Sequence, residues 1–237
     1  MKIESIYEDE FCLIVNKPNN VLVHHSYYSR NIKDDSLLQI LRQQFNNQNF
    51  YPIHRLDRKT SGLIILSKTK VNVKEFQQLF DNNLITKKYK ALVRGFTKNK
   101  GIINSPIKNN ETRIYKDALT LFYTLEHFEL QIPVEPYPTS RYSLIELEPK
   151  TGRTHQLRKH LNKIAHPIIG DHKYGNRHHN QMFEREFCID NLFLQAYFLE
   201  FNHPILSKSV KICLDLPKFW NTTLNYFNDK STSRNIK

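Results

Sequence analysis

Cysteine is scarce in this sequence. The 237 residues include three cysteines, Cys12, Cys188 and Cys213, which are widely spaced and make no CxxC pair. Three thiols cannot form an even disulfide framework, and such sparse cysteine is typical of proteins from a reducing compartment. The sequence therefore argues against a disulfide-stabilised secreted scaffold.

Long apolar segments are also missing. No apolar run approaches the length of a membrane span, and the first residues, Met1–Ser5, contain no apolar core of a signal peptide. A transmembrane helix needs about 20 apolar residues, so no membrane span is expected. We predict a soluble, cytoplasmic protein without membrane contact.

The motifs of several enzyme classes are absent. With six glycines there is little room for a phosphate-binding GxxxxGK[ST] loop, and neither that motif nor the GxSxG of serine hydrolases occurs. Histidines are numerous, but they form no HExxH motif and show no ligand-like spacing. We therefore expect no metal site.

Positive charge and aromatic residues are abundant. Lysine plus arginine total 35 and aspartate plus glutamate total 23, which gives a formal charge of +12. Aromatic residues make up 12% of the chain, which argues against wholesale disorder. A charge excess of this size favours a polyanionic partner such as nucleic acid. A compositional bias toward lysine and asparagine is the alternative origin of this charge.

Strand-like patterns outnumber helical ones, and no regular alternation of strands and helices appears. Helical spacing predicts helices over residues 37–45, 73–80, 153–164 and 217–227. Strands are expected over residues 3–7, 11–15, 21–23, 63–66, 87–95, 142–147 and 192–201.

This pattern indicates an α+β fold with a large, mostly antiparallel mixed sheet and flanking helices. We expect a single domain over residues 1–227. Within it, an insertion at about 97–138 would pack beside the core, and residues 228–237 would form a disordered tail.

The segment 54–62, with the sequence HRLDRKTSG, is the most informative in the chain. It places Asp57 between two arginines and before a hydroxyl–glycine turn. The apolar run 63–66 that follows reads as a buried strand. A carboxylate on a loop that a strand holds rigid is in a usual catalytic position, and nearby cations favour its ionised form. The alternative is a surface aspartate in a salt-bridged turn.

Tyr89 is the second candidate. It lies in a strand-like segment between Lys87, Lys88 and Lys90. An aromatic ring among cations suits an extruded base, because the ring stacks on the base while the cations hold phosphates. A half-buried strand tyrosine with exposed lysines is the alternative.

The segment 150–161, KTGRTHQLRKHL, marks a turn that enters a helix. Arg158 lies one helical turn beyond Thr154, where its guanidinium can face the loop of Asp57 and orient the carboxylate. An exposed basic helix is the alternative. The following loop, 166–175, either shapes the site and contacts phosphates or serves as a structural connector.

Together these segments resemble the pseudouridine synthases of the RluA type. The resemblance covers nearly the whole chain and is carried by Asn16-Lys17-Pro18, the 54–62 motif, Lys88-Tyr89, and the segments 152–158 and 166–175. The stretches 24–26, 137–142 and 146–150 are similar to one branch of the family, whose members act on uridine 65 of tRNA.

The resemblance implies a central, mostly antiparallel sheet with a cleft. It implies that Asp57 is the catalytic carboxylate, Tyr89 the active-site tyrosine, and Arg158 the salt-bridge partner of Asp57. It also implies that Arg55 enters the RNA beside the extruded base, and that the chain starts directly with the catalytic domain, without an S4-like RNA-binding module. The other polar members of the matched motifs are assigned to substrate binding: His54, Arg58, Thr60, Lys88, Arg153, His155 and Gln156.

The resemblance thus predicts an isomerase that converts a uridine of RNA to pseudouridine, most readily in tRNA, without a cofactor or metal and as a monomer. Two alternatives stay open. One is the same chemistry on ribosomal RNA, and the other is a non-catalytic RNA-binding protein. Binding alone would need only the cations, so the joint presence of Asp57, Tyr89 and Arg158 favours catalysis.

Overall fold

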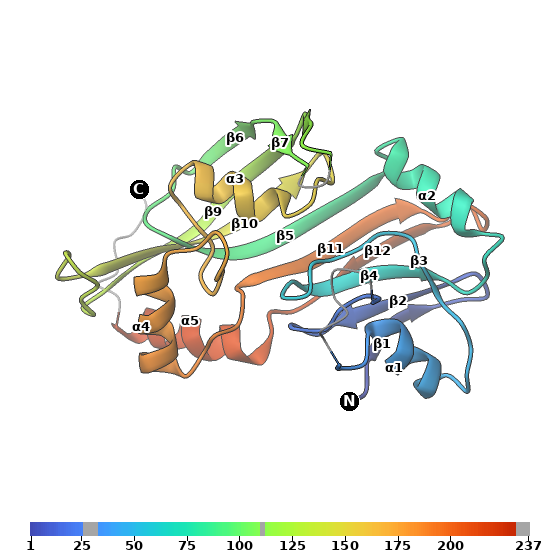
Figure 1. Cartoon of the computed structure of the whole chain (residues 1–237), viewed down its shortest axis with the longest axis horizontal. Helices are drawn as coiled ribbons and strands as arrows, with labels where there is room; N and C mark the ends of the chain where they lie inside the picture. The colour runs from blue at the N-terminus through green and yellow to red at the C-terminus, as the bar shows by residue number, and fades with distance from the viewer. Residues whose placement is uncertain (26–32, 110–111, 231–237) are drawn as a thin grey trace. The chain divides into compact units, whose positions relative to one another are not determined.

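The computed structural model describes residues 1–25, 33–109 and 112–230 (Figure 1). By its internal contacts the chain divides into two compact units, each made of two separate segments. Unit 1 comprises Met1–Lys87 and Ala196–Leu214, and unit 2 comprises Lys88–Gln195 and Asp215–Lys237. Within the described residues, no helix is long and apolar enough to cross a membrane.

Unit 1 is a sheet with two flanking helices. Its strands follow the order β1-β2-β4-β11, with β3 beside β4 and β12 beside β11. The pairings β1–β2, β2–β4, β3–β4 and β11–β12 are antiparallel. The elements are β1 (Glu4–Glu8), β2 (Cys12–Lys17), α1 (Leu37–Gln44), β3 (Tyr51–Pro52), β4 (Ser61–Ser67), α2 (Val73–Asp81), β11 (Leu194–Asn202) and β12 (Ser209–Cys213).

Strand β4 lies at the centre of unit 1. All seven of its residues are buried, as its uninterrupted apolar run predicts. Helix α1 begins with a capping box: the Ser36 hydroxyl accepts from the Gln39 amide while the Gln39 side chain accepts from the Ser36 amide. Leu37, Ile40 and Leu41 then form its buried face.

Unit 2 contains a second group of strands and three helices. Its strands follow the order β5-β10-β9-β6, and the pairings of β10 with β5 and β9, and of β6 with β9, are antiparallel. Strands β7 and β8 form a separate two-stranded sheet. The elements are β5 (Ile85–Arg94), β6 (Lys100–Asn104), β7 (Ile107–Lys108), β8 (Tyr115–Lys116), β9 (Leu119–Leu130), β10 (Ser140–Pro149), α3 (Gln156–Lys163), α4 (Arg177–Phe187) and α5 (Lys218–Lys230).

Aromatic residues form the core of unit 2. Tyr142 of β10 is fully buried and stacks on Phe227 of α5, with ring centroids 5.5 Å apart. Phe183 of α4 packs edge-on against both rings. This cluster joins α4 and α5 to the strands, and Figure 1 shows the two helices beside each other.

The expected α+β class with mostly antiparallel strands is confirmed, but several local predictions are wrong. Residues 97–138, expected as an insertion beside the core, include β6 and the long strand β9, which pairs with β10 along its whole length. This segment is therefore part of the sheet of unit 2. Its alternation of more and less buried side chains is the period of a strand.

Three further differences concern shorter segments. Residues 21–23 form no strand, because the carbonyl oxygens of Leu22 and Val23 accept from the first amides of α1. Helix α4 is not predicted from the sequence. Helix α5 extends to Lys230, into the expected disordered tail. The rest of that tail, residues 231–237, and Ser26 lie outside the described residues.

Candidate active site

Asp57 occupies the first position of a tight turn directly before β4. The Thr60 amide donates to the Asp57 carbonyl oxygen at 3.1 Å, which closes the turn over Arg58 and Lys59. The carboxylate is half-buried, whereas the strand that follows is wholly buried. The expectation of a carboxylate on a loop anchored by a strand is therefore confirmed, and its catalytic role stays a prediction.

Lys17 stabilises this turn through hydrogen bonds from its buried ammonium. It is fully buried at the end of β2, and its ammonium donates to the carbonyl oxygens of Pro18 (2.8 Å), Val21 (2.9 Å) and Arg58 (3.0 Å). Burial lowers the pKa of Lys17 to about 7, and the negative charge of Asp57 opposes this shift. The sequence indicates Lys17 only as part of a matched motif, and it gives no sign that Lys17 is buried beside the Asp57 turn.

A hydrogen bond from Asn19 also stabilises the Asp57 turn, and Gly62 follows this turn at the start of β4. The Asn19 side chain donates to the Lys59 carbonyl oxygen at 2.5 Å. Gly62 has φ +112°, and a Cβ there would lie 2.1 Å from the carbonyl oxygen of Ala196 in β11. Only glycine permits both this backbone conformation and this close approach. The turn is therefore fixed on both sides by backbone contacts within unit 1.

His54 braces the loop against the sheet. Its Nε2 atom accepts from the Ile65 amide at 3.0 Å, and its ring lies 4.8 Å from the Phe80 ring. Burial first, and the charge of Lys87 second, lower the pKa of His54 to about 3. The imidazole is therefore neutral at ordinary pH, as the accepting Nε2 atom requires.

The remaining loop residues differ in exposure. Arg55 is exposed, and the Arg58 guanidinium donates to the Asn20 carbonyl oxygen at 3.2 Å. Thr60 is 2% exposed, and within the described part of the chain its hydroxyl has no hydrogen-bond partner. Unit 1 thus gathers five of the predicted residues on one loop, and their contacts to substrate stay predictions.

Tyr89 and Lys88 lie on β5 in unit 2. Tyr89 pairs with Leu147 of β10 and packs, half-buried, against the core of this unit. Lys88 donates to the Glu146 carboxylate at 2.9 Å. This bond raises the pKa of Lys88, although partial burial acts in the opposite direction. Lys88 therefore keeps its charge next to a carboxylate, and its predicted contact with substrate is untested.

Arg158 forms a bidentate ion pair that the sequence did not indicate. Its Nε and Nη2 atoms donate to the two carboxylate oxygens of Asp171 at 2.7 and 2.8 Å, and both side chains are buried. The amides of Lys173 and Tyr174 also donate to Asp171. Burial alone would raise the pKa of the Asp171 carboxyl, but bonds from Arg158 and these amides lower it. The pairing of Arg158 with Asp57 that the resemblance implies stays a prediction.

The turn before α3 positions the other predicted residues of unit 2. The Gln156 side chain accepts from the Thr151 hydroxyl and the Arg153 amide, and it donates to the Leu119 carbonyl and the Thr120 hydroxyl. Its amide is therefore committed to holding the turn.

Two neighbours of Gln156 complete this turn. His155 has φ +55° and bonds the Tyr174 hydroxyl at 3.0 Å, while the exposed Arg153 donates to the Asp117 carbonyl oxygen. Their substrate contacts, like those of Gln156, stay predictions.

One group of described residues has the atoms of a metal site. The ligand atoms of Asp9, Cys12 and His203 lie within 4.8 Å of one another. The Nδ1 atom of His203 accepts from the amides of Ile205 and Leu206, so its Nε2 atom carries the ring proton and faces Asp9 at 3.3 Å. A protonated ring nitrogen is not a metal ligand, so this arrangement suits a hydrogen-bonded cluster within unit 1.

Comparison with known proteins adds independent information. The family model described as RNA pseudouridylate synthase matches residues 11–163. A Pasteurella multocida protein named tRNA pseudouridine synthase C is 38% identical over 96% of this chain and 97% of its own length. A Vibrio vulnificus protein of the same name is 35% identical over 97% of each chain.

Solved structures agree with these sequence matches. The human RNA Pseudouridylate Synthase Domain Containing 1 has a TM-score of 0.72 at 28% identity, covering 91% of this chain and 84% of its own. The human RNA Pseudouridylate Synthase Domain Containing 4 has a TM-score of 0.70 at 22% identity, covering 95% and 93%, and so supports the fold alone. The expected resemblance, including the tRNA branch, is confirmed.

Proposed function

The chain belongs to the RNA pseudouridylate synthase family, and on this premise we propose that it converts uridine 65 of tRNA to pseudouridine. The relatives named tRNA pseudouridine synthase C match it over nearly their whole length, which supports tRNA as the substrate. We expect the enzyme to act as a monomer in the cytoplasm.

The observation that carries this proposal is the construction of the Asp57 turn. The turn is closed by Thr60, held by the buried Lys17, and followed by a glycine that nothing else can replace. A rigid loop that presents a half-buried carboxylate is what a catalytic group requires, since its geometry is set before substrate arrives.

The reaction is an isomerisation that needs access to the sugar and the base. The bond between N1 of uracil and C1′ of ribose breaks, the base rotates, and a bond forms between C5 and C1′. The proton on C5 is removed and N1 gains a proton, so no oxidant or reductant is consumed. Neither C1′ nor C5 can be reached inside a helix, so the uridine must leave the stack.

The predicted residues divide this work. Asp57 starts the cleavage, either by attacking the nucleoside or by removing the 2′ proton of the ribose. Tyr89 stacks on the uracil and assists removal of the C5 proton. Arg55 fills the space left in the helix, and Arg158 orients Asp57 without neutralising it. The cationic residues of the motifs hold the RNA backbone.

The test is to map pseudouridine by carbodiimide and primer extension on unmodified tRNA and ribosomal RNA. Wild type is compared with Asp57→Asn and with the control Asp81→Asn, which changes an exposed aspartate at the end of α2. We expect one modified site in tRNA, at position 65, that disappears only in Asp57→Asn. The RNA affinity of that variant should stay close to wild type.

Each other result overturns a defined part of the proposal. Modification of ribosomal RNA alone would keep the chemistry and reject the tRNA substrate. A loss of RNA affinity in Asp57→Asn equal to its loss of activity would reject a catalytic role for the carboxylate. No pseudouridine on either RNA would reject the enzymatic function on these substrates.

A further inference from the structure

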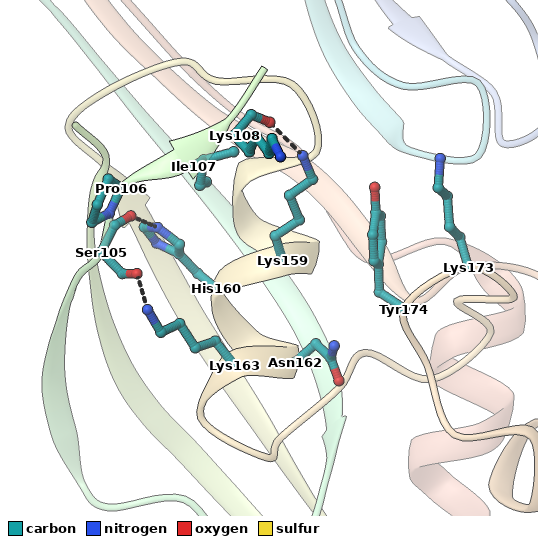
Figure 2. A pocket seen from close by; sticks show the side chains of 10 residues that line it. All are labelled: Ser105, Pro106, Ile107, Lys108, Lys159, His160, Asn162, Lys163, Lys173 and Tyr174. Carbon is teal, nitrogen blue, oxygen red and sulfur yellow. Dashed lines mark hydrogen bonds between the residues drawn. The ribbon is translucent and has the colours of Figure 1, made fainter. Parts of the chain in front are cut away.

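Unit 2 contains a lysine-lined pocket that includes none of the residues assigned above to the reaction. It has a volume of about 450 Å³ and lies between the segment 105–108, one side of α3, and residues 173–174 (Figure 2). Four of its lining residues are lysines: Lys108, Lys159, Lys163 and Lys173. None of its described lining residues is acidic, so the pocket concentrates positive charge.

The pocket wall is held in place by a buried histidine. The Nε2 atom of His160 donates to the Ser105 carbonyl oxygen at 2.9 Å, and its Nδ1 atom accepts from the Thr120 hydroxyl at 3.0 Å. Burial lowers the pKa of His160, so this ring is neutral and serves as a link between α3, β9 and the segment after β6. The backbone segments that carry Lys108, Lys159 and Lys163 are therefore held together by His160.

The lysines are arranged on two sides of the opening. Lys159 donates to the Lys108 carbonyl oxygen at 3.2 Å, and Lys163, one helical turn later, donates to the Ser105 hydroxyl at 2.5 Å. Figure 2 shows both side chains reaching from α3 toward the segment 105–108. Lys173 extends over the ring of Tyr174, with its ammonium 5.6 Å from the ring centroid.

This combination suits phosphate groups. An ammonium has three donors and no acceptor, so four of them can bind several phosphate oxygens at once, while they carry no information about the base. Carboxylates that would compete are absent from the described lining residues. The nearby Asp171 is already committed to Arg158.

We propose that this lysine pocket binds backbone phosphates of the RNA substrate, away from the modified uridine. The proposal rests on the proposed function, since it assigns the pocket to the same RNA. It predicts a contribution to affinity and to the salt dependence of binding, with little effect on the chemical step.

The test removes three exposed lysines together, as Lys108→Gln, Lys163→Gln and Lys173→Gln. We expect the dissociation constant for tRNA and the KM to rise by roughly 10-fold or more. The negative slope of log K against log salt should become shallower by about 1 for each phosphate that the variant no longer binds. The kcat should stay close to wild type. A second triple variant with arginine at the same positions keeps the charge and should retain the affinity.

The matched control removes the same amount of charge elsewhere. Lys2→Gln, Lys74→Gln and Lys218→Gln change exposed lysines far from this pocket in the sequence, and they lower the net charge equally. Equal losses of affinity in both triple variants would assign the effect to overall charge and overturn the proposal. Circular dichroism and thermal unfolding verify that both variants fold.

Two further outcomes distinguish a failure of the pocket from a failure of the enzymatic function. If wild type makes pseudouridine but the pocket variant binds and reacts like wild type, the pocket is rejected while the proposed function stands. If inorganic phosphate binds the wild-type pocket at millimolar concentration and tRNA affinity is unchanged in the variant, the pocket takes a free anion and the proposal is overturned. Absence of pseudouridine with wild type would instead refute the proposed function.

Discussion

Lys17 and Arg58 are 41 positions apart in the sequence, yet the Lys17 ammonium donates to the Arg58 carbonyl oxygen at 3.0 Å. The same ammonium also binds two carbonyl oxygens of the turn after β2. Three carbonyl acceptors match the three donors of an ammonium, which offsets part of the cost of burying it. One side chain therefore ties the end of β2 to the turn that carries Asp57.

The variant Lys17→Met tests this tie. Methionine has a similar length but donates no hydrogen bond, so the three carbonyl oxygens lose their donor. We expect a loss of unfolding free energy of about 1–3 kcal/mol for each carbonyl that stays buried and unpaired. Turnover should also fall, because the Asp57 turn loses its support. Urea unfolding and the rate of pseudouridine formation measure the two effects, with Lys2→Met as the exposed control. Unchanged values for both would refute the supporting role.

His179 predicts a pH dependence of stability. Its Nδ1 atom donates to the Tyr142 hydroxyl at 2.9 Å, and its Nε2 atom accepts from Arg94 at 3.2 Å. Burial first, and then the charge of Arg94, lower the pKa of His179 to about 4. In the unfolded chain it is about 6.5. Between these values the unfolded chain binds more protons, so stability is lost as the pH falls through this window.

The variant His179→Gln removes this titration while keeping a donor and an acceptor. We expect the slope of unfolding free energy against pH, between pH 6.5 and 4, to decrease by up to about 1.4 kcal/mol per pH unit. The control is His25→Gln, which changes an exposed histidine of unit 1 and leaves the contacts of His179 intact. Chemical unfolding at a series of pH values makes the measurement. Equal slopes of unfolding free energy against pH in the two variants would contradict the assignment of this pH dependence to His179.

The sequence predicted the Asp57 loop well and its support poorly, for physical reasons. A polar motif before an apolar run indicates a loop on a buried strand because both signals are local. Lys17 precedes Pro18 at the end of β2, where nothing in the local sequence indicates a buried cation, and only the folded chain shows that it is buried. Burial of a lysine depends on acceptors from distant segments, which no local pattern contains.

The same limit applies to Arg158 and to β9. The resemblance implies that Arg158 pairs with Asp57, and nothing in the sequence indicated its bidentate pair with Asp171, which lies in the loop after α3. Residues 119–130 mix aromatic and charged side chains, so the sequence indicates only a short β-like piece over residues 118–123. Their pairing with β10 provides the order that the local pattern only weakly indicates.

Gly62→Ala should disrupt unit 1. The added Cβ would lie 2.1 Å from the Ala196 carbonyl oxygen, and the residue has φ +112°, so both sterics and backbone conformation oppose the change. We expect a loss of stability above about 3 kcal/mol, or failure to fold. Gly152→Ala is the matched control, because nothing lies within 4 Å of its added Cβ. Thermal unfolding compares them, and equal melting temperatures would contradict this packing.

Asp171→Asn should weaken the bidentate bond that holds the buried Arg158 guanidinium. The change removes the charge that faces Arg158 and weakens both bonds of the bidentate pair. Breaking a buried ion pair from one side costs about 3–5 kcal/mol, so we expect a loss of that order in urea unfolding. The exposed Asp229→Asn should change stability by less than about 0.5 kcal/mol. A loss in Asp171→Asn no greater than in this control would show that Arg158 does not depend on Asp171.

Arg55→Ala tests whether this arginine replaces the extruded uridine in the helix. Arg55 is exposed, so stability should change by less than about 0.5 kcal/mol. Extruding a base costs a few kcal/mol, so loss of a side chain that offsets this cost should slow turnover by roughly 100-fold. The control Arg177→Ala removes one positive charge from an exposed arginine of unit 2, and its turnover rate should stay near that of wild type.

A second substrate makes this last test specific to extrusion. A mismatched target uridine needs less energy to leave the stack. On a tRNA transcript with that mismatch, the turnover rate of Arg55→Ala should therefore be closer to that of wild type. Single-turnover rates on paired and mismatched transcripts give the comparison. An equal defect on both transcripts would mean that Arg55 binds the backbone or the reacting nucleotide instead, since neither role depends on whether the uridine is paired.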